Sequence, residues 1–202
     1  MKLIGLFDSP YVRRVAVSMR LYDMPFEHIA LSVFRHQDEM RKINPLLKVP
    51  LLVLDSGERL MESSFILDYL EGEAAPEKRL TPAFGESRRH VQQQCAMALL
   101  AAEKTLQSVY ESTMRPAEFS YAPWLERCIG QMHAAFGMLE ALPPSSALAG
   151  EPLTQGDVTT AIVLRFAQYM LASEFPVGRY SQLEKLSAYC ESLPAFIQTP
   201  LE

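Results

Sequence analysis

The sequence predicts an α/β domain with the element order β-α-β-α-β-β-α, followed by an all-helical domain. Three observations predict this fold class. Short apolar segments with strand character alternate with helical patterns near the start, a turn-rich charged segment follows, and every later apolar pattern has helical spacing. We therefore expect one domain over residues 1–75, a linker over residues 76–85 and a helical domain over residues 86–202.

The first domain begins with a strand, a helix and a second strand. Leu3–Phe7 and Phe26–Leu31 are apolar and have strand character, and a helix is expected between them from Pro10 to about Tyr22. Proline is favoured at the first helical position because its missing N–H is not needed there. Apolar residues of this helix recur at positions i, i+3, i+4 and i+7, which predicts one face packed on a sheet: Val12, Val15, Ala16 and Met19.

The rest of the first domain reads as a helix, a hairpin and a last helix. A short helix is expected over Gln37–Ile43. Leu51–Leu54 and Arg59–Met61 flank the turn Asp55-Ser56-Gly57-Glu58, which is typical of a β-hairpin. A helix over Phe65–Leu70 then closes the unit.

Everything after residue 85 has helical character. The preceding stretch "GEAAPEKRLTPAFG" is rich in turn formers and charge, which is typical of a domain boundary. Two long amphipathic stripes follow, with a break around Pro116–Pro123. Val158–Leu171 is apolar nearly all round, with Arg165 as its only charge, so we expect it in the middle of the second domain. Shorter helices are expected around Leu183–Cys190 and Ala195–Gln198.

Composition and charge exclude several classes of function. Acidic residues outnumber basic ones by 24 to 19, and no run of Lys and Arg is longer than two, so a nucleic-acid partner is not expected. No apolar run approaches the ~20 residues of a membrane span, and the first residues lack signal-peptide features. The cysteines lie far apart among apolar residues, which suits buried thiols in a reducing compartment: Cys95, Cys128 and Cys190. We expect a cytoplasmic protein without a membrane partner.

The sequence lacks the motifs that are typical of metal-dependent and nucleotide-binding enzymes. The chain has no Gly-rich phosphate loop, no paired CxxC motif and no dinucleotide fingerprint after its first strand. The four histidines show no ligand spacing with one another, so we expect surface histidines and no metal site: His28, His36, His90 and His133.

Ser9-Pro10 lies at the junction between the first strand and the first helix. Backbone N–H groups and the helix dipole favour an anion at such a junction. Serine is also a preferred N-cap residue. The local sequence leaves both interpretations open, a helix cap and a hydroxyl that handles a reactive atom.

Three further motifs stand at the starts of elements. In "KVPLL" Pro50 opens a strand although it cannot donate to the ladder. In "MESS" a carboxylate and hydroxyls fall at the start of a helix, as in a capping cluster. In "LTQGD" Thr154 and Asp157 have the spacing of a capping box, which we interpret as structural.

The combination of these motifs with the element order resembles the cytosolic glutathione transferase family over the whole chain. The resemblance implies a thioredoxin-like first domain that binds glutathione as co-substrate. Pro50 would match the family's cis-proline, Val49 would pair its backbone with the cysteinyl part, and Glu62 and Ser63 would hold the γ-glutamyl end. Lys48 is expected near the glycine carboxylate. The resemblance also implies a homodimer with contacts from Phe65–Met114.

The resemblance also implies a mechanism based on the glutathione thiolate. An ordinary Cys thiol has a pKa of about 8.5, and one hydrogen bond from Ser9 would lower that pKa by roughly one to two units. Tyr11 is the runner-up for this donor. Arg13 and Arg14 would add positive potential, although arginines on a helix more commonly face solvent. Serine rather than cysteine at position 9 excludes a stable mixed disulfide there.

The expected reaction is attack of the thiolate on small hydrophobic electrophiles, as in detoxification. The residues expected at the second-substrate pocket come from the segment after the second strand and from the helical domain: Phe34, Arg35, Tyr110, Met114 and Phe166. Two alternatives stay open. One is a binding or regulatory protein of this fold without turnover, since fold does not imply function. The other is a glutathione-dependent peroxidase or isomerase.

Overall fold

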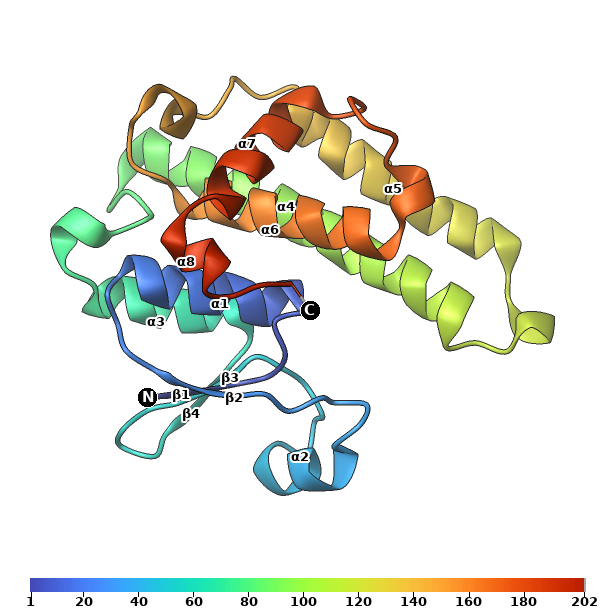
Figure 1. Cartoon of the computed structure of the whole chain (residues 1–202), viewed down its shortest axis with the longest axis horizontal. Helices are drawn as coiled ribbons and strands as arrows, with labels where there is room; N and C mark the ends of the chain where they lie inside the picture. The colour runs from blue at the N-terminus through green and yellow to red at the C-terminus, as the bar shows by residue number, and fades with distance from the viewer. Residues whose placement is uncertain (202) are drawn as a thin grey trace. The chain divides into compact units, whose positions relative to one another are not determined.

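The computed structural model describes residues 1–201. These residues form two compact units. The first unit contains Met1–Leu80 together with the chain from Leu193 onward, and the second contains Thr81–Ser192. Figure 1 shows the elements of the first unit in blue, cyan and dark red, and those of the second in green to orange-red. The predicted order β-α-β-α-β-β-α is confirmed in the first unit.

The first unit is built on a four-stranded mixed sheet with the strand order β2-β1-β3-β4. β1 (Lys2–Ile4) pairs in parallel with β2 (Glu27–Ile29) and antiparallel with β3 (Leu51–Val53). β4 (Arg59–Met61) pairs antiparallel with β3 and forms the predicted hairpin. Each of the first three strands is shorter than predicted, because the apolar pattern continues beyond the residues that pair in the sheet.

Helices cover both faces of this sheet. α1 (Pro10–Leu21) and α3 (Ser63–Glu73) lie side by side on one face, and α2 (Gln37–Ile43) lies on the other (Figure 1). Side chains alternate across a strand, so successive residues face opposite layers. On the α2 side, fully buried Met40 packs with Ile4, Leu31 and Leu51 in one apolar cluster.

The chain end packs with the first unit and not with the helical one, which corrects the prediction that residues 86–202 form the second domain. The Nε of Arg13 donates to the carbonyl oxygen of Thr199 at 2.7 Å, and the guanidinium lies over the Phe196 ring. Arg20 donates to the Gln198 side chain at 2.7 Å. α8 (Pro194–Ile197) therefore packs on α1, through contacts that the apolar periodicity of neither helix indicates.

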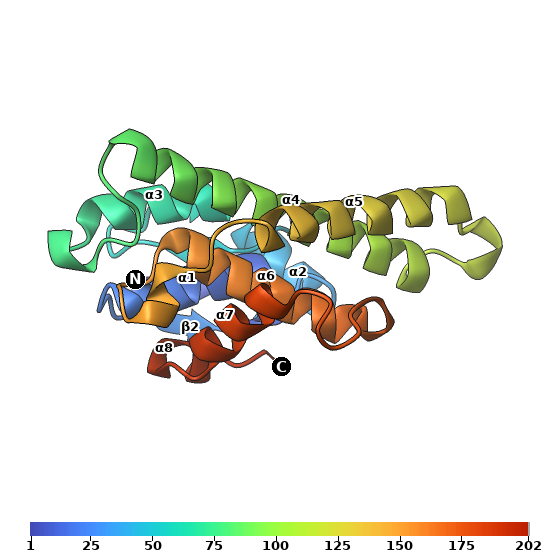
Figure 2. The same cartoon turned by 90° about the horizontal axis from the view of Figure 1, so that it is seen from above.

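The second unit is helical, as predicted. Its long helices are α4 (Gly85–Thr113) and α5 (Ala122–Glu140), which run antiparallel (Figure 2). α6 (Gln155–Met170) packs against α4 and against α7 (Ser181–Glu191). Most of α6 is buried and its Arg165 is exposed, in agreement with the sequence pattern. Short 3-10 turns complete the described chain: η1 (Pro76–Lys78) in the first unit, and η2 (Ala117–Phe119), η3 (Ser146–Ala149) and η4 (Ala172–Glu174) in the second.

α6 begins with the predicted capping box. The hydroxyl of Thr154 accepts from the backbone N–H of Asp157 at 3.2 Å, and the Asp157 carboxylate accepts from the backbone N–H of Thr154 at 2.8 Å. Two backbone donors at the helix start are thereby satisfied reciprocally. Asp157 is only 4% exposed, so the box fixes the start of the helix inside the helical unit.

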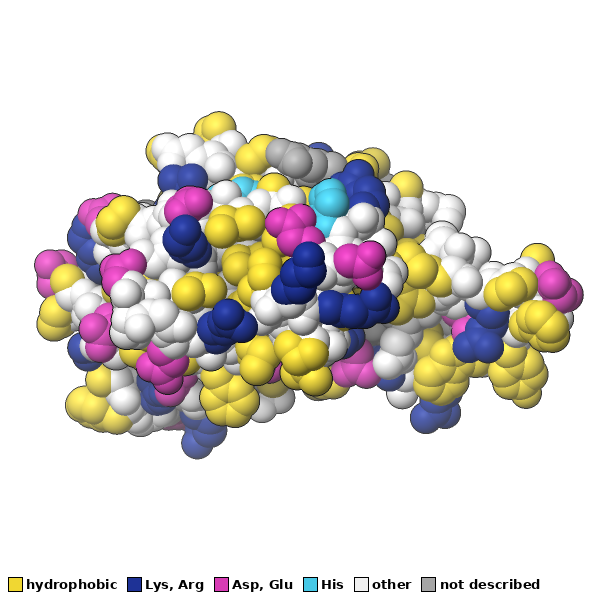
Figure 3. All heavy atoms as spheres, turned by 90° about the horizontal axis from the view of Figure 1, so that it is seen from below, with side chains coloured by type: hydrophobic (Ala, Val, Ile, Leu, Met, Phe, Trp, Pro, Cys, Tyr) yellow, Lys and Arg dark blue, Asp and Glu magenta, His cyan; other side chains and the backbone are white. Residues whose placement is uncertain are grey.

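On the face that Figure 3 shows, neither positively nor negatively charged side chains predominate. Lys and Arg side chains are interspersed there with acidic and apolar ones. Among the described residues, no helix is both long enough and apolar enough to cross a bilayer.

Candidate functional site

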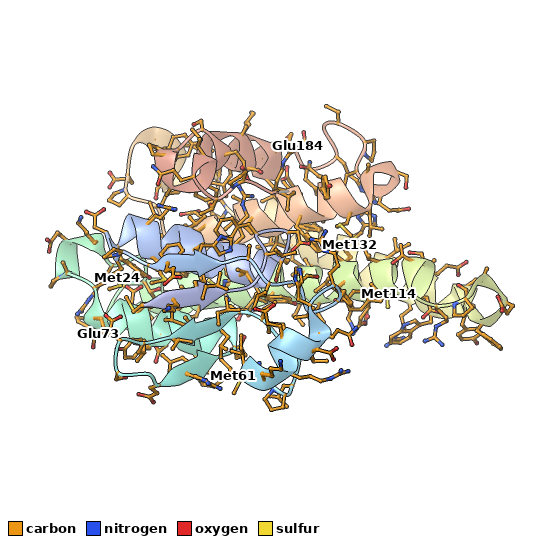
Figure 4. All side chains as sticks on the ribbon, turned by 60° about the horizontal axis from the view of Figure 1, so that its bottom comes forward. Met24, Met61, Glu73, Met114, Met132 and Glu184 are labelled. Atoms are coloured by element: carbon orange, nitrogen blue, oxygen red, sulfur yellow. The ribbon has the colours of Figure 1, made fainter. Side chains whose placement is uncertain are left out.

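Three segments that the sequence singled out meet at one edge of the sheet of the first unit. The register pairs Ile4 with Leu51 and Leu51 with Met61. One position further along, Gly5 leaves β1, Pro50 enters β3 and Glu62 leaves β4 at the same edge. Antiparallel pairing causes this convergence, because β3 begins where β1 and β4 end. Figure 4 labels Met61, the last residue of β4, directly before Glu62.

Ser9 is the N-cap residue of α1. Its hydroxyl oxygen accepts from the backbone N–H of Val12 at 3.4 Å, and Pro10 occupies the first helical position. A hydroxyl has one proton and two lone pairs, so this cap uses the oxygen only as an acceptor. The hydroxyl can therefore cap the helix and donate its proton to another atom. Tyr11 lies in the first turn of α1 and is half-buried.

The segment before β3 lies close to the end of β1. The Val49–Pro50 peptide is cis, as predicted. Gly5 has a φ of 133°, and a Cβ added there would lie 2.6 Å from Val12 and 3.0 Å from Val49. Only glycine fits at this crossing of the chain, because any side chain would collide with both neighbours.

Asn44 holds the loop that leads to Val49, and sequence reasoning did not identify it. Its side-chain amide donates to the carbonyl oxygen of Lys48 at 2.9 Å, and its side-chain oxygen accepts from the backbone of Leu46 at 3.1 Å. Asn44 is 3% exposed. The Asn-Pro pair at positions 44 and 45 is a turn signal that could have indicated this role. Lys48 itself is exposed beside this loop.

Glu62 stands at the start of α3 in an unusual backbone conformation. Its φ is 69°, which is uncommon for a residue other than glycine and often marks a functional site. Its carboxylate accepts from the backbone N–H of Ser64 at 3.1 Å and from the hydroxyl of Ser63 at 3.4 Å. The side chain is exposed, so it can also bind a ligand cation. The predicted capping cluster is confirmed, with the carboxylate as its N-cap.

Arg13 and Arg14 of α1 are buried, whereas arginines on a helix more commonly face solvent. Arg13 is 1% exposed and Arg14 is 2% exposed. Arg14 donates from Nη1 to the hydroxyl oxygen of Ser63 at 3.1 Å and lies 3.5 Å from that of Ser64. Arg13 instead contacts the C-terminal segment. Helical periodicity did not reveal this, because both arginines fall beside the apolar stripe that covers the sheet.

The five residues predicted for the second substrate are divided between the two units. Phe34 is 50% exposed and Arg35 is exposed, both in the segment after β2. Tyr110 and Met114 lie at the end of α4 and are 39% and 56% exposed; Figure 4 labels Met114. Phe166 is only 3% exposed, so its ring is a core side chain.

Two of the four histidines, which were predicted at the surface, are only partly exposed. His28 stacks on Phe7 with ring centroids 3.9 Å apart, and its Nε2 lies 2.7 Å from the carbonyl oxygen of Gly5. The Nδ1 of His133 lies 2.9 Å from the hydroxyl of Tyr180 in an aromatic cluster. Among residues 1–201, no group of His, Cys, Asp and Glu could hold a metal ion.

The cysteines are free thiols within the helical unit. Cys128 and Cys190 are buried as predicted, whereas Cys95 is only partly buried. Burial raises the pKa of the Cys190 thiol to about 12 and also raises the pKa of Cys128. Both thiols are neutral at physiological pH and are poor nucleophiles. The first unit contains no cysteine, so a thiol nucleophile at this site must come from a ligand.

Comparison with known proteins agrees with this geometry. Residues 3–78 match the family model described as "Glutathione S-transferase, N-terminal domain". Glutathione S-transferase U4 of Arabidopsis thaliana is 37% identical over 71 residues, which are 35% of this chain and 31% of that protein. A probable maleylacetoacetate isomerase 2 of Drosophila melanogaster is 34% identical over 85 residues, which are 40% of this chain and 37% of that protein. The matched region thus spans about a third of the length of these curated relatives.

A solved structure extends the likeness to the whole chain. A glutathione transferase family member from Pseudomonas fluorescens Pf-5, crystallised with bound glutathione, superimposes with a TM-score of 0.86. The two are 25% identical, and the comparison covers 100% of this chain and 98% of that one. The fold is that of a thioredoxin-like domain joined to a helical domain. Residues 3–78 thus match the N-terminal domain of the glutathione S-transferase family, and the whole chain is similar in fold to a solved glutathione transferase structure.

Proposed function

We propose that the chain is a glutathione transferase that binds glutathione at the sheet edge of its first unit. In this proposal Glu62 pairs with the ammonium group of the γ-glutamyl end, and Ser63 contacts the same end. The backbone of Val49 pairs with the cysteinyl part, Pro50 shapes that segment, and Lys48 contacts the glycine carboxylate. The observation that carries the proposal is the register, which brings the chain on both sides of Pro50 and Glu62 to the edge where β1 ends.

Ser9 would activate the thiol of the bound glutathione. Its oxygen caps α1 as an acceptor, so its proton is available for a thiolate placed at the end of β1. A hydrogen bond to a charged acceptor contributes about 1.5 to 3 kcal/mol, which corresponds to a fall of roughly one to two units in the thiol pKa. The N-terminus of α1 favours the same negative charge. Tyr11, two residues further on, is the alternative donor.

The thiolate would then form a bond from sulfur to an electrophilic carbon. In a substitution the leaving group departs with the electron pair of its own bond, and in an addition a proton completes the product. We propose small hydrophobic electrophiles as substrates, consistent with a role in detoxification. In the first unit, the half-exposed side chain of Phe34 and the exposed Arg35 are candidates for contact with this substrate.

Three alternatives use the same glutathione site. A glutathione-dependent isomerase is favoured by the likeness to the probable maleylacetoacetate isomerase of Drosophila melanogaster, and such a reaction returns the thiol unchanged. A glutathione-dependent peroxidase would use the same thiolate. A binding or regulatory protein without turnover would keep Glu62 and Ser63 but show no activity on electrophiles, peroxides or isomerisable substrates.

The proposal includes a homodimer in the cytoplasm. Phe65 and Tyr69 of α3 are 75% and 38% exposed, and their spacing of four residues places both on one face of the helix. These residues lie in the stretch Phe65–Met114 that the family resemblance assigns to subunit contacts. The free thiols at Cys95, Cys128 and Cys190 suit a reducing compartment.

Calorimetric titration with glutathione tests the site. Glu62→Ala is expected to weaken binding by more than ~1 kcal/mol, because the ligand ammonium loses its charged partner. Glu58→Ala is the matched control, since Glu58 lies in the hairpin turn at the opposite edge of the sheet. Equal affinities of wild type and Glu62→Ala would refute the assignment of this carboxylate.

A further inference from the structure

Arg14 places a buried positive charge directly behind the start of α3. The guanidinium belongs to α1, is 2% exposed, and reaches the hydroxyl oxygen of Ser63 at 3.1 Å. Burial of a charge costs free energy unless polar groups of the protein satisfy it. The charge is therefore held at the position where α3 begins, beside the candidate γ-glutamyl site.

The contact fixes the direction of the Ser63 hydroxyl. An arginine side chain has donors only, so Ser63 must accept from it. The single proton of that hydroxyl must then point elsewhere, and in this structure it is donated to the Glu62 carboxylate at 3.4 Å. Without Arg14 the same hydroxyl could turn and use its proton in another direction.

We propose that Arg14 is a positioning residue for the α-carboxylate of the γ-glutamyl end. This inference rests on the proposed glutathione site. The γ-glutamyl end carries an ammonium and a carboxylate on one carbon. In the complex the Ser63 hydroxyl donates its proton to the ligand carboxylate in place of Glu62, while Glu62 is the partner of the ammonium where the ligand has one. Arg14 holds the hydroxyl in this orientation and adds positive potential behind it.

Two ligand analogues separate this role from a general effect on folding. The first, 4-aminobutanoyl-Cys-Gly, keeps the ammonium but lacks the α-carboxylate. The second, 4-carboxybutanoyl-Cys-Gly, keeps the carboxylate but lacks the ammonium. Affinities of glutathione and both analogues are measured by calorimetry for wild type and for Arg14→Met.

Arg14→Met should weaken binding of glutathione and of the carboxylate-bearing analogue about tenfold, because a charge-assisted interaction is lost. Binding of 4-aminobutanoyl-Cys-Gly should change less than twofold, because that ligand never uses the oriented hydroxyl. Arg13→Met is the matched control: Arg13 is an equally buried arginine on the same helix, and it donates to Thr199 of the C-terminal segment. It should affect none of the three affinities by more than twofold.

An equal loss for all three ligands in Arg14→Met would overturn the inference, and so would unchanged affinity for glutathione. If Arg14→Met does not fold, Arg14→Gln is measured in the same way, and the same two outcomes decide. Failure of the proposed function looks different, because wild type itself would then bind no glutathione.

Discussion

Ser9 caps α1, and we propose that the same hydroxyl also activates the ligand thiol, two interpretations that the local sequence left open. The cap to Val12 uses a lone pair of the oxygen, whereas thiolate activation would use the proton. The structure is therefore compatible with both roles, and measurements on variants separate them.

Ser9→Ala and Tyr11→Phe separate the cap from the thiolate donor. Loss of an N-cap hydroxyl costs about 0.5 to 2 kcal/mol of stability, so Ser9→Ala should melt earlier than wild type. Loss of the thiolate hydrogen bond should also slow conjugation at neutral pH by roughly ten- to a hundredfold. Melting temperature and turnover with a panel of electrophiles check both effects.

The outcome assigns the donor. If Ser9→Ala melts earlier but keeps its turnover rate, Ser9 is a cap only. If Tyr11→Phe takes the kinetic loss, Tyr11 is the donor. Wild type that binds glutathione but turns over no electrophile, peroxide or isomerisable substrate favours the binding-protein alternative.

Single residues also show where sequence patterns stop being informative. Ser9 could be recognised as a cap because capping depends on neighbours three residues away. The partners of Arg14 and His133 lie 47 to 49 positions away in sequence, so their burial could not be read from local periodicity. The contact of Arg13 with Thr199 spans 186 positions and escaped prediction for the same reason.

At the scale of elements, the order of strands and helices in the first unit follows from the sequence, but the sheet topology does not. The parallel pairing of β1 with β2 and the insertion of β1 between β2 and β3 are set by tertiary packing. That topology brings Pro50 and Glu62 to the edge where β1 ends. Each motif could be recognised separately in the sequence. That they form one site was inferred only from the resemblance to a family.

The capping box of α6 is the element-scale feature that the sequence predicted most directly. Thr154→Ala should destabilise the protein by about 0.5 to 2 kcal/mol, because the N–H of Asp157 loses its partner at a helix start. Thr154→Ser keeps the hydroxyl and should remain close to wild type. Urea unfolding of the three proteins measures the difference, and equal stability of Thr154→Ala and wild type would show that the box contributes nothing.

At the scale of the whole molecule, the chain consists of one mixed α/β unit and one helical unit. The first presents the candidate glutathione site, and the second is a helical bundle whose buried α6 starts at the capping box. The C-terminal segment returns to α1, so a chain truncated before Leu193 would lack the partner of Arg13.

The exposed aromatic side chains of α3 carry the prediction of a homodimer. Sedimentation at micromolar concentration should give twice the mass of the chain for wild type. Phe65→Glu should shift the protein to a monomer, because a charge would be buried at the interface without a partner. Phe119→Glu is the control, since Phe119 is 67% exposed but lies outside the predicted stretch. A monomeric wild type would contradict the prediction.

The central claim is that the first unit binds glutathione and stabilises its thiolate. The most direct test is a pH titration of the ultraviolet thiolate absorbance of bound glutathione, in wild type and Ser9→Ala. We expect the pKa of the bound thiol in wild type to lie roughly one to two units below the ordinary value of about 8.5. In Ser9→Ala it should return toward that ordinary value. A bound thiol in wild type with an unshifted pKa, or the absence of glutathione binding, would contradict the account.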